Sequence, residues 1–261
     1  MTTQAESKIV EAISGNLYQS YLSIGQTTGG EIGREADLTW IYTGQPFLNR
    51  VFDAHIAGDA AARIRSVQQR YAKWQVPVSW VCDPATEPAD LAVQLQAQGF
   101  QHAFHSFGMA LEMPSWQPRD LPPISYERVA DDQLMQVWAN IVSAAFHGFS
   151  SQTLLTIFSG ISDPRWSYYL GFVQGKPVTT VSLLTTGETV GVYWVGTLPA
   201  VRGQGLAASL LNAVLSQEID KERQKLIILH ALEPAHNLYL RLGFEDYCSY
   251  NMYGWSAEQP K

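Results

Sequence analysis

The chain has 261 residues, of which 46% are hydrophobic and 16% are charged, which indicates a globular protein with room for one large domain or two ordinary ones. Its formal net charge of −7 and its scattered basic residues argue against nucleic-acid binding, which needs cationic contacts to phosphates. No apolar run approaches the ~20 residues of a membrane span, and the first residues lack the apolar core of a signal peptide. We therefore expect a cytoplasmic protein without a membrane partner. Cys82 and Cys248 show neither metal-binding nor redox spacing, so we expect core thiols and no metal site.

The first half of the chain shows one clear pattern and then meets a proline-rich segment. Residues 79–111 have the pattern of a strand, a Glu-Pro dipeptide, an amphipathic helix, a Gly-Phe dipeptide and a second strand. Residues 112–124 hold four prolines and little hydrophobic periodicity, which is typical of a linker. We therefore predict one domain at residues 1–113, a linker at 114–123 and a second domain at 124–261.

The second half alternates between strand and helix patterns. Asp131 is well placed to cap a helix, Pro199 ends a strand, and Pro234 suits the first turn of the last helix, which Gly243 closes. The order β-α-α-β-β-β-α-β-α-β predicts an α/β fold. The predicted strands are 124–129, 166–173, 177–186, 189–197, 225–232 and 245–255, and the predicted helices are 132–146, 151–161, 206–219 and one from Pro234 to Gly243.

The two halves share an internal similarity. Glu87-Pro88 corresponds to Glu233-Pro234, and Gly99-Phe100 corresponds to Gly243-Phe244, each within a strand-helix-strand pattern whose spacings differ by two residues. This similarity indicates a duplicated domain.

The segment Arg202-Gly203-Gln204-Gly205 occurs only in the second half, directly before the helix that begins near Leu206. A helix N-terminus offers unpaired N–H groups and the positive end of the helix dipole, and glycines let an anion approach them. Arg202 adds a permanent positive charge. The pattern therefore predicts a phosphate site.

Two other interpretations of this segment are a helix-entry turn without a ligand and a dinucleotide site. Residues 203–208 match the pattern G-x-G-x-x-A of nicotinamide enzymes. That motif needs a strand running straight into the first glycine and an acid about 20 residues later. Pro199 separates the strand from the first glycine. The next strand, LIILHAL, has no acid until Glu233, about thirty residues on, so we rank the nicotinamide interpretation lower.

Two motifs resemble the GNAT superfamily of acyl-CoA-dependent N-acyltransferases. Its signature R/Q-x-x-G-x-G/A is matched by Arg202, Gly205 and Ala207, and AHNLYLRLGF at 235–244 resembles the family's helix ending L-Y-x-x-L-G-F. The resemblance covers residues 124–255 and implies the GNAT fold, a mixed central sheet flanked by helices. In the first half Leu95 takes the place of Tyr239 and the glycine turn is missing, so the resemblance implies a degenerate copy without its own cofactor.

The resemblance further implies acetyl-CoA as the cofactor, bound by its pyrophosphate on the glycine loop and by its pantetheine arm along the strand at 192–197, which splays from its neighbour. The N–H of Val195 is expected to stabilise the oxyanion that forms as the amine attacks. The implied cofactor-binding residues are Val195, Gly196, Thr197, Arg202, Gly203, Gln204, Gly205, Leu206, Ala207 and Ala208.

Tyr239 matches the family tyrosine that protonates the departing thiolate, and a phenol and a thiol have ordinary pKa values close enough for this transfer. The attacking amine must lose a proton, but the family's base positions hold Gly191 and Tyr193. His230 is the best remaining candidate for the base. Glu233, which we expect to cap a helix, Glu188, in a predicted turn, and a chain of waters are the other options.

The acceptor pocket is expected between the loop that holds Phe146, His147 and Phe149 and the strand that holds Tyr193 and Trp194. Aromatic walls suit an acceptor with an apolar or cationic portion. We expect a small-molecule or peptide amine as the partner, and a homodimer is one option for assembly. The leading hypothesis is an acetyl-CoA-dependent N-acetyltransferase that works by direct attack of a primary amine. The alternative is a catalytically silent protein that binds acyl-CoA or a partner.

Overall fold

The computed structural model describes residues 3–26, 29–146, 148–159, 161 and 163–257. The chain forms two compact units, and each unit combines two separate stretches of sequence. Unit 1 contains Met1–Leu17 and Gly108–Tyr247, and unit 2 contains Tyr18–Phe107 and Cys248–Lys261. These units do not follow the bounds 1–113 and 124–261 predicted for the two domains, and those domain limits stay a prediction.

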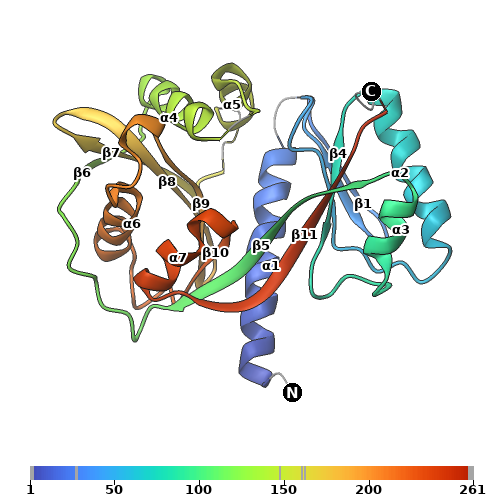
Figure 1. The fold of residues 1–261 in the computed structure, drawn as a ribbon, viewed down its shortest axis with the longest axis horizontal. Helices are drawn as coiled ribbons and strands as arrows, with labels where there is room; N and C mark the ends of the chain where they lie inside the picture. The colour runs from blue at the N-terminus through green and yellow to red at the C-terminus, as the bar shows by residue number, and fades with distance from the viewer. Residues whose placement is uncertain (1–2, 27–28, 147, 160, 162, 258–261) are drawn as a thin grey trace. The chain divides into compact units, whose positions relative to one another are not determined.

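Unit 1 is a mixed sheet with helices on both faces (Figure 1). Its strand order is β11-β5-β10-β9-β8-β7-β6, in which β9 and β10 are parallel while β6, β7, β8 and β9 pair antiparallel. The order of elements along the chain confirms the predicted α/β arrangement. The strands are β6 (Ser125–Arg128), β7 (Trp166–Val173), β8 (Lys176–Thr186), β9 (Thr189–Thr197), β10 (Leu226–Ala231) and part of β5 (Gln101–Glu112) and β11 (Glu245–Trp255). The helices are α4 (Asp132–Ala145), α5 (Ser151–Phe158), α6 (Leu206–Gln217), α7 (Glu233–Leu242) and a 3₁₀ turn at Pro199–Val201, with the first part of α1 (Gln4–Gly25).

Two neighbouring tyrosines of β7 show how the helices divide between the faces. The ring of Tyr168 packs edge-on against Trp138 of α4, with ring centroids 5.2 Å apart, and against Phe158 of α5 at 6.3 Å. The hydroxyl of Tyr169 points to the other face, where it lies 3.4 Å from the carboxylate of Glu218 at the end of α6. Since adjacent strand residues point to opposite faces, α4 and α5 cover one face and α6 covers the other.

Unit 2 is a smaller sheet in the order β1-β2-β3-β4-β11-β5, in which β3 and β4 run parallel. Its strands are β1 (Glu31–Arg34), β2 (Thr39–Tyr42), β3 (Arg50–Phe52) and β4 (Val78–Cys82), and its helices are α2 (Ala60–Trp74), α3 (Leu91–Ala97) and the rest of α1. Its core gathers apolar side chains of α2, α3 and one sheet face, among them Ile64, Val67, Leu95 and Trp80.

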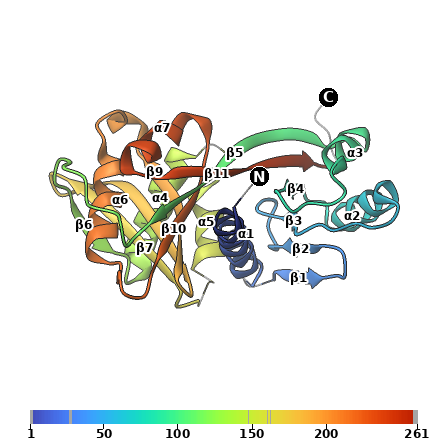
Figure 2. The same ribbon diagram turned by 90° about the horizontal axis from the view of Figure 1, so that it is seen from below.

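The strands β5 and β11 run through both units, as Figure 2 shows. In unit 2, β4 pairs antiparallel with β11, from Cys82 opposite Asn251 to Val78 opposite Trp255. In unit 1, β10 lies beside β5. The sheet of each unit is therefore completed by the last strand of the other half of the sequence.

The internal similarity is visible in the elements themselves. The order β4-α3-β5 matches β10-α7-β11. Gly99 directly follows the C-cap of α3 and Gly243 is the C-cap of α7, and both have a left-handed φ, of 88° and 100°. A left-handed residue of this kind commonly closes a helix, and glycine adopts it without strain. The match is imperfect at the start, because α7 begins at Glu233 whereas α3 begins at Leu91, three residues beyond Pro88.

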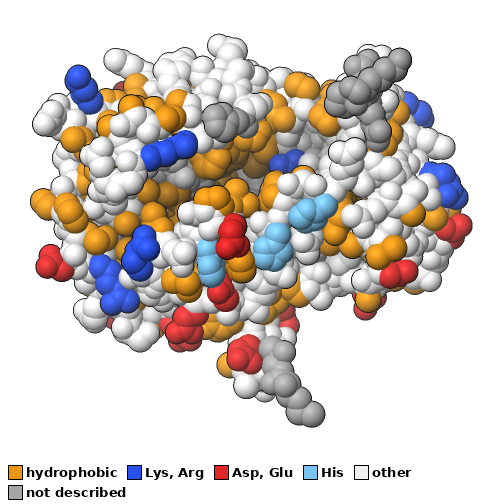
Figure 3. Space-filling model, viewed as in Figure 1, with side chains coloured by type: hydrophobic (Ala, Val, Ile, Leu, Met, Phe, Trp, Pro, Cys, Tyr) orange, Lys and Arg blue, Asp and Glu red, His pale blue; other side chains and the backbone are white. Residues whose placement is uncertain are grey.

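Several sequence predictions meet the structure with small changes. Asp131 caps α4 as predicted, since its carboxylate accepts a hydrogen bond from the N–H of Leu134 at 2.8 Å. α5 ends at Phe158 and α6 at Gln217, slightly before the predicted ends. Cys82 and Cys248 are free thiols that are only half-buried. No helix in the described residues is long and apolar enough to cross a membrane. On the face drawn in Figure 3, Lys and Arg side chains are dispersed among acidic ones.

Candidate active site

β9 and β10 separate partway along their length. Their parallel register runs from Thr189 opposite Leu226 to Val192 opposite Leu229 and ends there. β9 nevertheless continues to Thr197 and β10 continues to Ala231. The far ends of these two strands therefore splay apart, as the family resemblance implies for the strand that receives the pantetheine arm.

A β-bulge in β9 accompanies the splay. In the pairing of β8 with β9, Ser182 lies opposite Tyr193 and Thr180 lies opposite Gly196, so that two residues of β9 face one residue of β8. The two residues at the bulge are Trp194 and Val195, and Trp194 has a left-handed φ of 51°. Bulges bend a strand and are frequent at functional sites. Neither ladder of β9 gives Val195 a partner residue.

Two threonine hydroxyls of β8 hold the bulge in place. Thr180 donates its hydroxyl proton to the carbonyl of Trp194 at 2.8 Å, and Thr179 donates to the carbonyl of Gly196 at 2.8 Å. Gly196 also has little room for a side chain, because a Cβ there would lie 3.0 Å from the Cβ of Ala145 on α4. These contacts give hydrogen-bond partners to carbonyls at the bulge and directly after it.

The N-terminus of α6 is open. Gly203 and Gly205 have left-handed φ values of 77° and 75°, and a Cβ at either would meet no atom within 4 Å. The N-cap residue Gly205 offers no side-chain cap, and the first bond within the helix runs from the N–H of Ser209 to the carbonyl of Gly205 at 2.9 Å. The N–H groups of residues 206–208 therefore have no partner within the helix, which is the arrangement that binds a phosphate.

The side chain of Arg202 bonds two backbone carbonyls, and its predicted role in binding the cofactor stays a prediction. Its guanidinium donates to the carbonyl of Thr197 at 3.1 Å and to the carbonyl of Ala145, the last residue of α4, at 2.8 Å. Its own N–H points to the carbonyl of Pro199 at 3.4 Å. The hydrogen bonds of Arg202 therefore join the end of β9 to the end of α4, where a cation also complements the helix dipole.

In unit 2, the elements β3, α2 and β4 correspond to β9, α6 and β10 of unit 1, but they leave no open helix N-terminus and no splayed strands. The N-cap of α2 is Asp59, whose carboxylate accepts from the N–H of Ala62 at 2.9 Å. Beyond the ends of β3 and β4, the N–H of Glu87 donates to the carbonyl of Ala54 at 2.8 Å, and the N–H of Ile56 donates to the carbonyl of Glu87 at 3.0 Å. The carboxylate of Asp59 therefore already occupies the N-terminus of α2. The segments that follow the parallel strands β3 and β4 stay hydrogen-bonded to each other.

The predicted general acid, Tyr239, lies on α7, which packs on β10. Its side chain is buried, and its ring meets Phe244 edge-on with centroids 5.9 Å apart. Burial raises the pKa of Tyr239 above its usual value, because a phenolate loses solvation there. The hydroxyl therefore keeps its proton at neutral pH, but the raised pKa makes it a weaker acid toward a thiolate.

The predicted bases fit less well. His230 lies on β10, one residue beyond the last pair with β9, and burial lowers its pKa to about 3. A group with this pKa is a weak base toward an alkylammonium ion. Glu233 is the first residue of α7 and not its N-cap, which is Leu232, so the predicted capping role is wrong. Glu188 is exposed in the turn between β8 and β9, as predicted.

The predicted acceptor wall is an aromatic cluster around Trp194. The rings of Phe146 and Phe149 meet the Trp194 ring edge-on, with centroids 5.9 and 6.1 Å away. Phe158 of α5 approaches the same ring to 5.1 Å, and Trp194 keeps partial exposure. His147 lies outside the described residues. The structure thus brings Phe146, Phe149 and Trp194 together.

Tyr193 belongs to a buried network that sequence reasoning missed. Its hydroxyl donates to Asn16 Oδ1 at 2.7 Å, and Asn16 Nδ2 donates to Thr186 Oγ1 at 2.7 Å and to the carbonyl of Leu184 at 3.1 Å. A Cβ at Gly191 would lie 2.0 Å from Asn16 Oδ1. The glycine at one family base position is therefore required by an asparagine of α1, a residue that no motif marks.

The comparisons with known proteins agree with this geometry. Residues 164–246 match the family model of the acetyltransferase (GNAT) domain. This region is a GNAT domain. No curated protein matches the chain. A GCN5-related N-acetyltransferase from Kribbella flavida has a similar solved structure, with a TM-score of 0.72 and 19% identity over 95% of this chain and 95% of that chain.

Two further solved structures are similar to most of the chain. A GCN5-related N-acetyltransferase from Sphaerobacter thermophilus has a TM-score of 0.62 and 17% identity, covering 87% of this chain and 79% of that one. A tandem GNAT protein from the clavulanic acid biosynthesis pathway has a TM-score of 0.57 and 15% identity, covering 86% of this chain and 79% of that one. At these identities the likeness shows the fold, which is the GNAT fold predicted from the two motifs. A GNAT domain supports acyl transfer in general.

Proposed function

We propose that unit 1 transfers the acetyl group of acetyl-CoA to a primary amine by direct attack. The observation that carries the proposal is the pairing of a splayed, bulged β9 with an uncapped α6 N-terminus directly after it. The N–H groups of residues 206–208 would hold the pyrophosphate, and the free edge of β9 would hold the pantetheine arm. Bound acetyl-CoA supplies an activated thioester.

The chain's own residues would then do three things. The N–H of Val195 donates to the oxygen on which negative charge develops, and the bulge fixes its position before the reaction begins. Tyr239 donates its proton to the departing thiolate. The aromatic cluster around Trp194 excludes water on the acceptor side. The low pKa of His230 favours a water path for removing the amine proton.

Release of free thiol from acetyl-CoA across a panel of small-molecule and peptide amines tests this proposal. We expect turnover with at least one amine, and a fall in kcat of about 10²-fold or more for Tyr239→Phe with little change in KM for acetyl-CoA. Tyr247→Phe, on the half-buried part of β11, is the matched control and should keep wild-type rates. Equal kcat for the wild type and Tyr239→Phe would remove Tyr239 from the mechanism.

A second candidate function is a silent acyl-CoA-binding protein. One observation favours it. The two positions where the family often carries a general base hold Gly191 and Tyr193 here. Tyr193 donates a hydrogen bond to Asn16, and Asn16 leaves no space for a side chain at Gly191. Thermal stabilisation by coenzyme A without turnover on any amine would select this alternative. The cytoplasmic location and the oligomeric state stay predictions.

We also propose that unit 2 binds no coenzyme, because Asp59 occupies the N-terminus of α2 and the ends of β3 and β4 are joined. Calorimetric titration with coenzyme A should give one site per chain. Asp59→Gly should leave that stoichiometry unchanged, since the joined strands still close the slot. A second site in either protein would contradict the proposal.

A further inference from the structure

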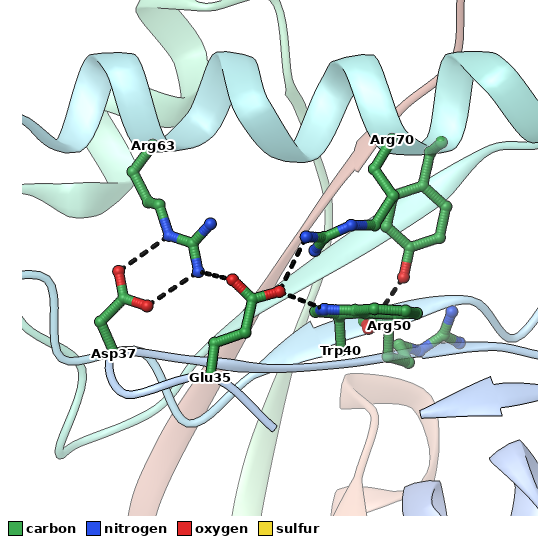
Figure 4. Close-up of polar contacts among 7 residues, drawn as sticks. Glu35, Asp37, Trp40, Arg50, Arg63 and Arg70 are labelled. Atoms are coloured by element: carbon green, nitrogen blue, oxygen red, sulfur yellow. Dashed lines mark hydrogen bonds and ion pairs between the residues drawn. The ribbon is translucent and has the colours of Figure 1, made fainter. Parts of the chain in front are cut away.

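Unit 2 contains a group of arginines whose charges are balanced by acids. Arg63 of α2 bonds the carboxylate of Asp37 through Nε and a terminal nitrogen, both at 2.8 Å, and reaches Glu35 at 2.5 Å. Arg70, two turns along α2, pairs with Glu35 at 2.7 Å. Figure 4 shows both guanidinium groups reaching from the helix to these two acids. Each of these half-buried cations thus has a carboxylate within hydrogen-bond distance.

Arg50 of β3 differs from them. Among the described residues Arg50 forms no ion pair. Its guanidinium donates to the carbonyl of its neighbour Asn49 at 3.0 Å and also hydrogen-bonds the side chain of Tyr21. Its Nε is buried and has no hydrogen-bond partner. In Figure 4 the guanidinium of Arg50 extends away from Glu35. The side chain still keeps partial exposure, so a solute can reach part of it.

Aromatic side chains lie on the same sheet face as Arg50. Val51 packs into the core beneath α2, so Arg50 and Phe52 point to the opposite sheet face, where Phe52 meets the ring of Tyr21 of α1 at 5.2 Å. The guanidinium carbon of Arg50 lies 5.9 Å from the centre of that same ring. Burial raises the pKa of Tyr21, so its hydroxyl stays neutral at physiological pH. Burial also lowers the pKa of Arg50, because the charged guanidinium loses solvation there, while its hydrogen bond to Tyr21 acts in the opposite direction.

A buried guanidinium without an anion is strongly destabilising, since it loses hydration and gains no compensating charge. Its planar fork of N–H donors matches a carboxylate in two parallel hydrogen bonds. One guanidinium balances one negative charge. A carboxylate monoanion would therefore leave the site neutral, whereas a phosphate dianion would leave a buried surplus charge.

We propose that Arg50, beside Tyr21, is the anchor of a binding site for a small organic carboxylate on the face of the unit 2 sheet opposite α2. The Arg50 guanidinium holds the carboxylate, and the Tyr21 hydroxyl supplies a neutral donor next to it. This site lies within unit 2 and does not depend on the coenzyme site of unit 1.

Thermal unfolding of the full chain with sodium acetate, sodium succinate, sodium phosphate or sodium chloride, at equal ionic strength and pH 7.5, tests the proposal. A carboxylate at about ten times its Kd should raise Tm by about 2–4 °C above the chloride value. Arg50→Met should remove this shift and raise the Tm of the ligand-free protein, because it removes a charge without a partner. Arg63→Met is the matched control, which should lower Tm and keep the carboxylate shift.

A measurement on the wild-type protein covers the case in which Arg50→Met does not fold. The arginine Nε–H signals in a ¹H–¹⁵N spectrum should include one that moves on titration with acetate and stays still with chloride. Absence of any carboxylate-specific change, or a carboxylate shift that persists in Arg50→Met, would overturn the proposal. An Arg50-dependent shift that is larger with phosphate than with acetate would overturn the assignment to carboxylates.

Discussion

Ala208 occupies the third position of α6, where a side chain decides what the helix N-terminus can hold. We expect Ala208→Glu to place a carboxylate over the N–H groups of residues 206–208 and to raise the Kd for coenzyme A about 10–100-fold. The same charge should stabilise the fold by about 0.3–1 kcal/mol, because an acid is favourable in the first turn of a helix. Calorimetry and urea unfolding measure the two effects.

Ala208→Gln has the same shape without the charge and is the matched control. It should bind coenzyme A more tightly than Ala208→Glu. Gly205 is a poorer position for this test, because its φ of 75° strains any L side chain placed there. Unchanged affinity in Ala208→Glu would show that the pyrophosphate does not lie on this helix.

His230 should make the protein less stable in acid. Its folded pKa of about 3 lies below the unfolded value of about 6.5, so the unfolded chain takes up the proton first as pH falls. Its contribution is fully present above pH 6.5 and is lost between there and about pH 3, with a slope of about 1.4 kcal/mol per pH unit.

Urea unfolding between pH 4 and 7.5 checks this expectation. His230→Gln should show a shallower loss of stability over that range. His55→Gln, which changes an exposed histidine, should follow the wild type. Parallel curves for the wild type and His230→Gln would mean that this ring does not resist protonation in the folded protein.

At the scale of elements, the bulge in β9 should matter for both catalysis and stability. Thr180→Val removes the hydroxyl that holds the carbonyl of Trp194, and we expect a stability loss of about 1–3 kcal/mol for the unsatisfied carbonyl. The N–H of Val195 then loses its fixed position, so we expect kcat to fall about 10-fold or more. Thiol-release kinetics and urea unfolding separate the two effects.

Thr185→Val makes the same substitution on the same strand, outside the bulge, and is the control. It should keep wild-type kcat. If both variants show the same kinetic change, the bulge has no special part in positioning the oxyanion donor.

The elements around the site were largely predictable, whereas the contacts that shape it were not. Pro199 and Gly243 fix where β9 and α7 end, because each restricts the backbone locally, and the predicted bounds of β9 and β11 agree with the structure. The bulge depends on hydroxyls of a neighbouring strand, and Gly191 depends on Asn16, which lies far away in sequence. Such non-local contacts leave no periodic signal in one sequence.

At the scale of the whole molecule, the exchange of strands is the feature that the sequence conceals. The predicted linker at 114–123 breaks the hydrophobic pattern and looks like a domain boundary. Strand partners are chosen by pairing in space, however, and β11 pairs with β4 across more than 160 residues of sequence. A hydrophobic strand pattern indicates that a strand forms and which faces it has, but it does not indicate which sheet receives it.

This exchange predicts that neither half of the sequence folds alone. A fragment of residues 1–113 lacks β11, which pairs with β4, and a fragment of 124–261 lacks β5, which lies beside β10. Each fragment would expose the unpaired edge of a long strand, so we expect aggregation or a loss of cooperative unfolding.

Co-expression of 1–113 with 114–261 is the control, because it restores every strand and should give a soluble complex. Circular dichroism and thermal unfolding of the fragments provide the measurement. A fragment 124–261 that unfolds cooperatively and binds coenzyme A would show that β5 is dispensable and that the second half is an autonomous domain.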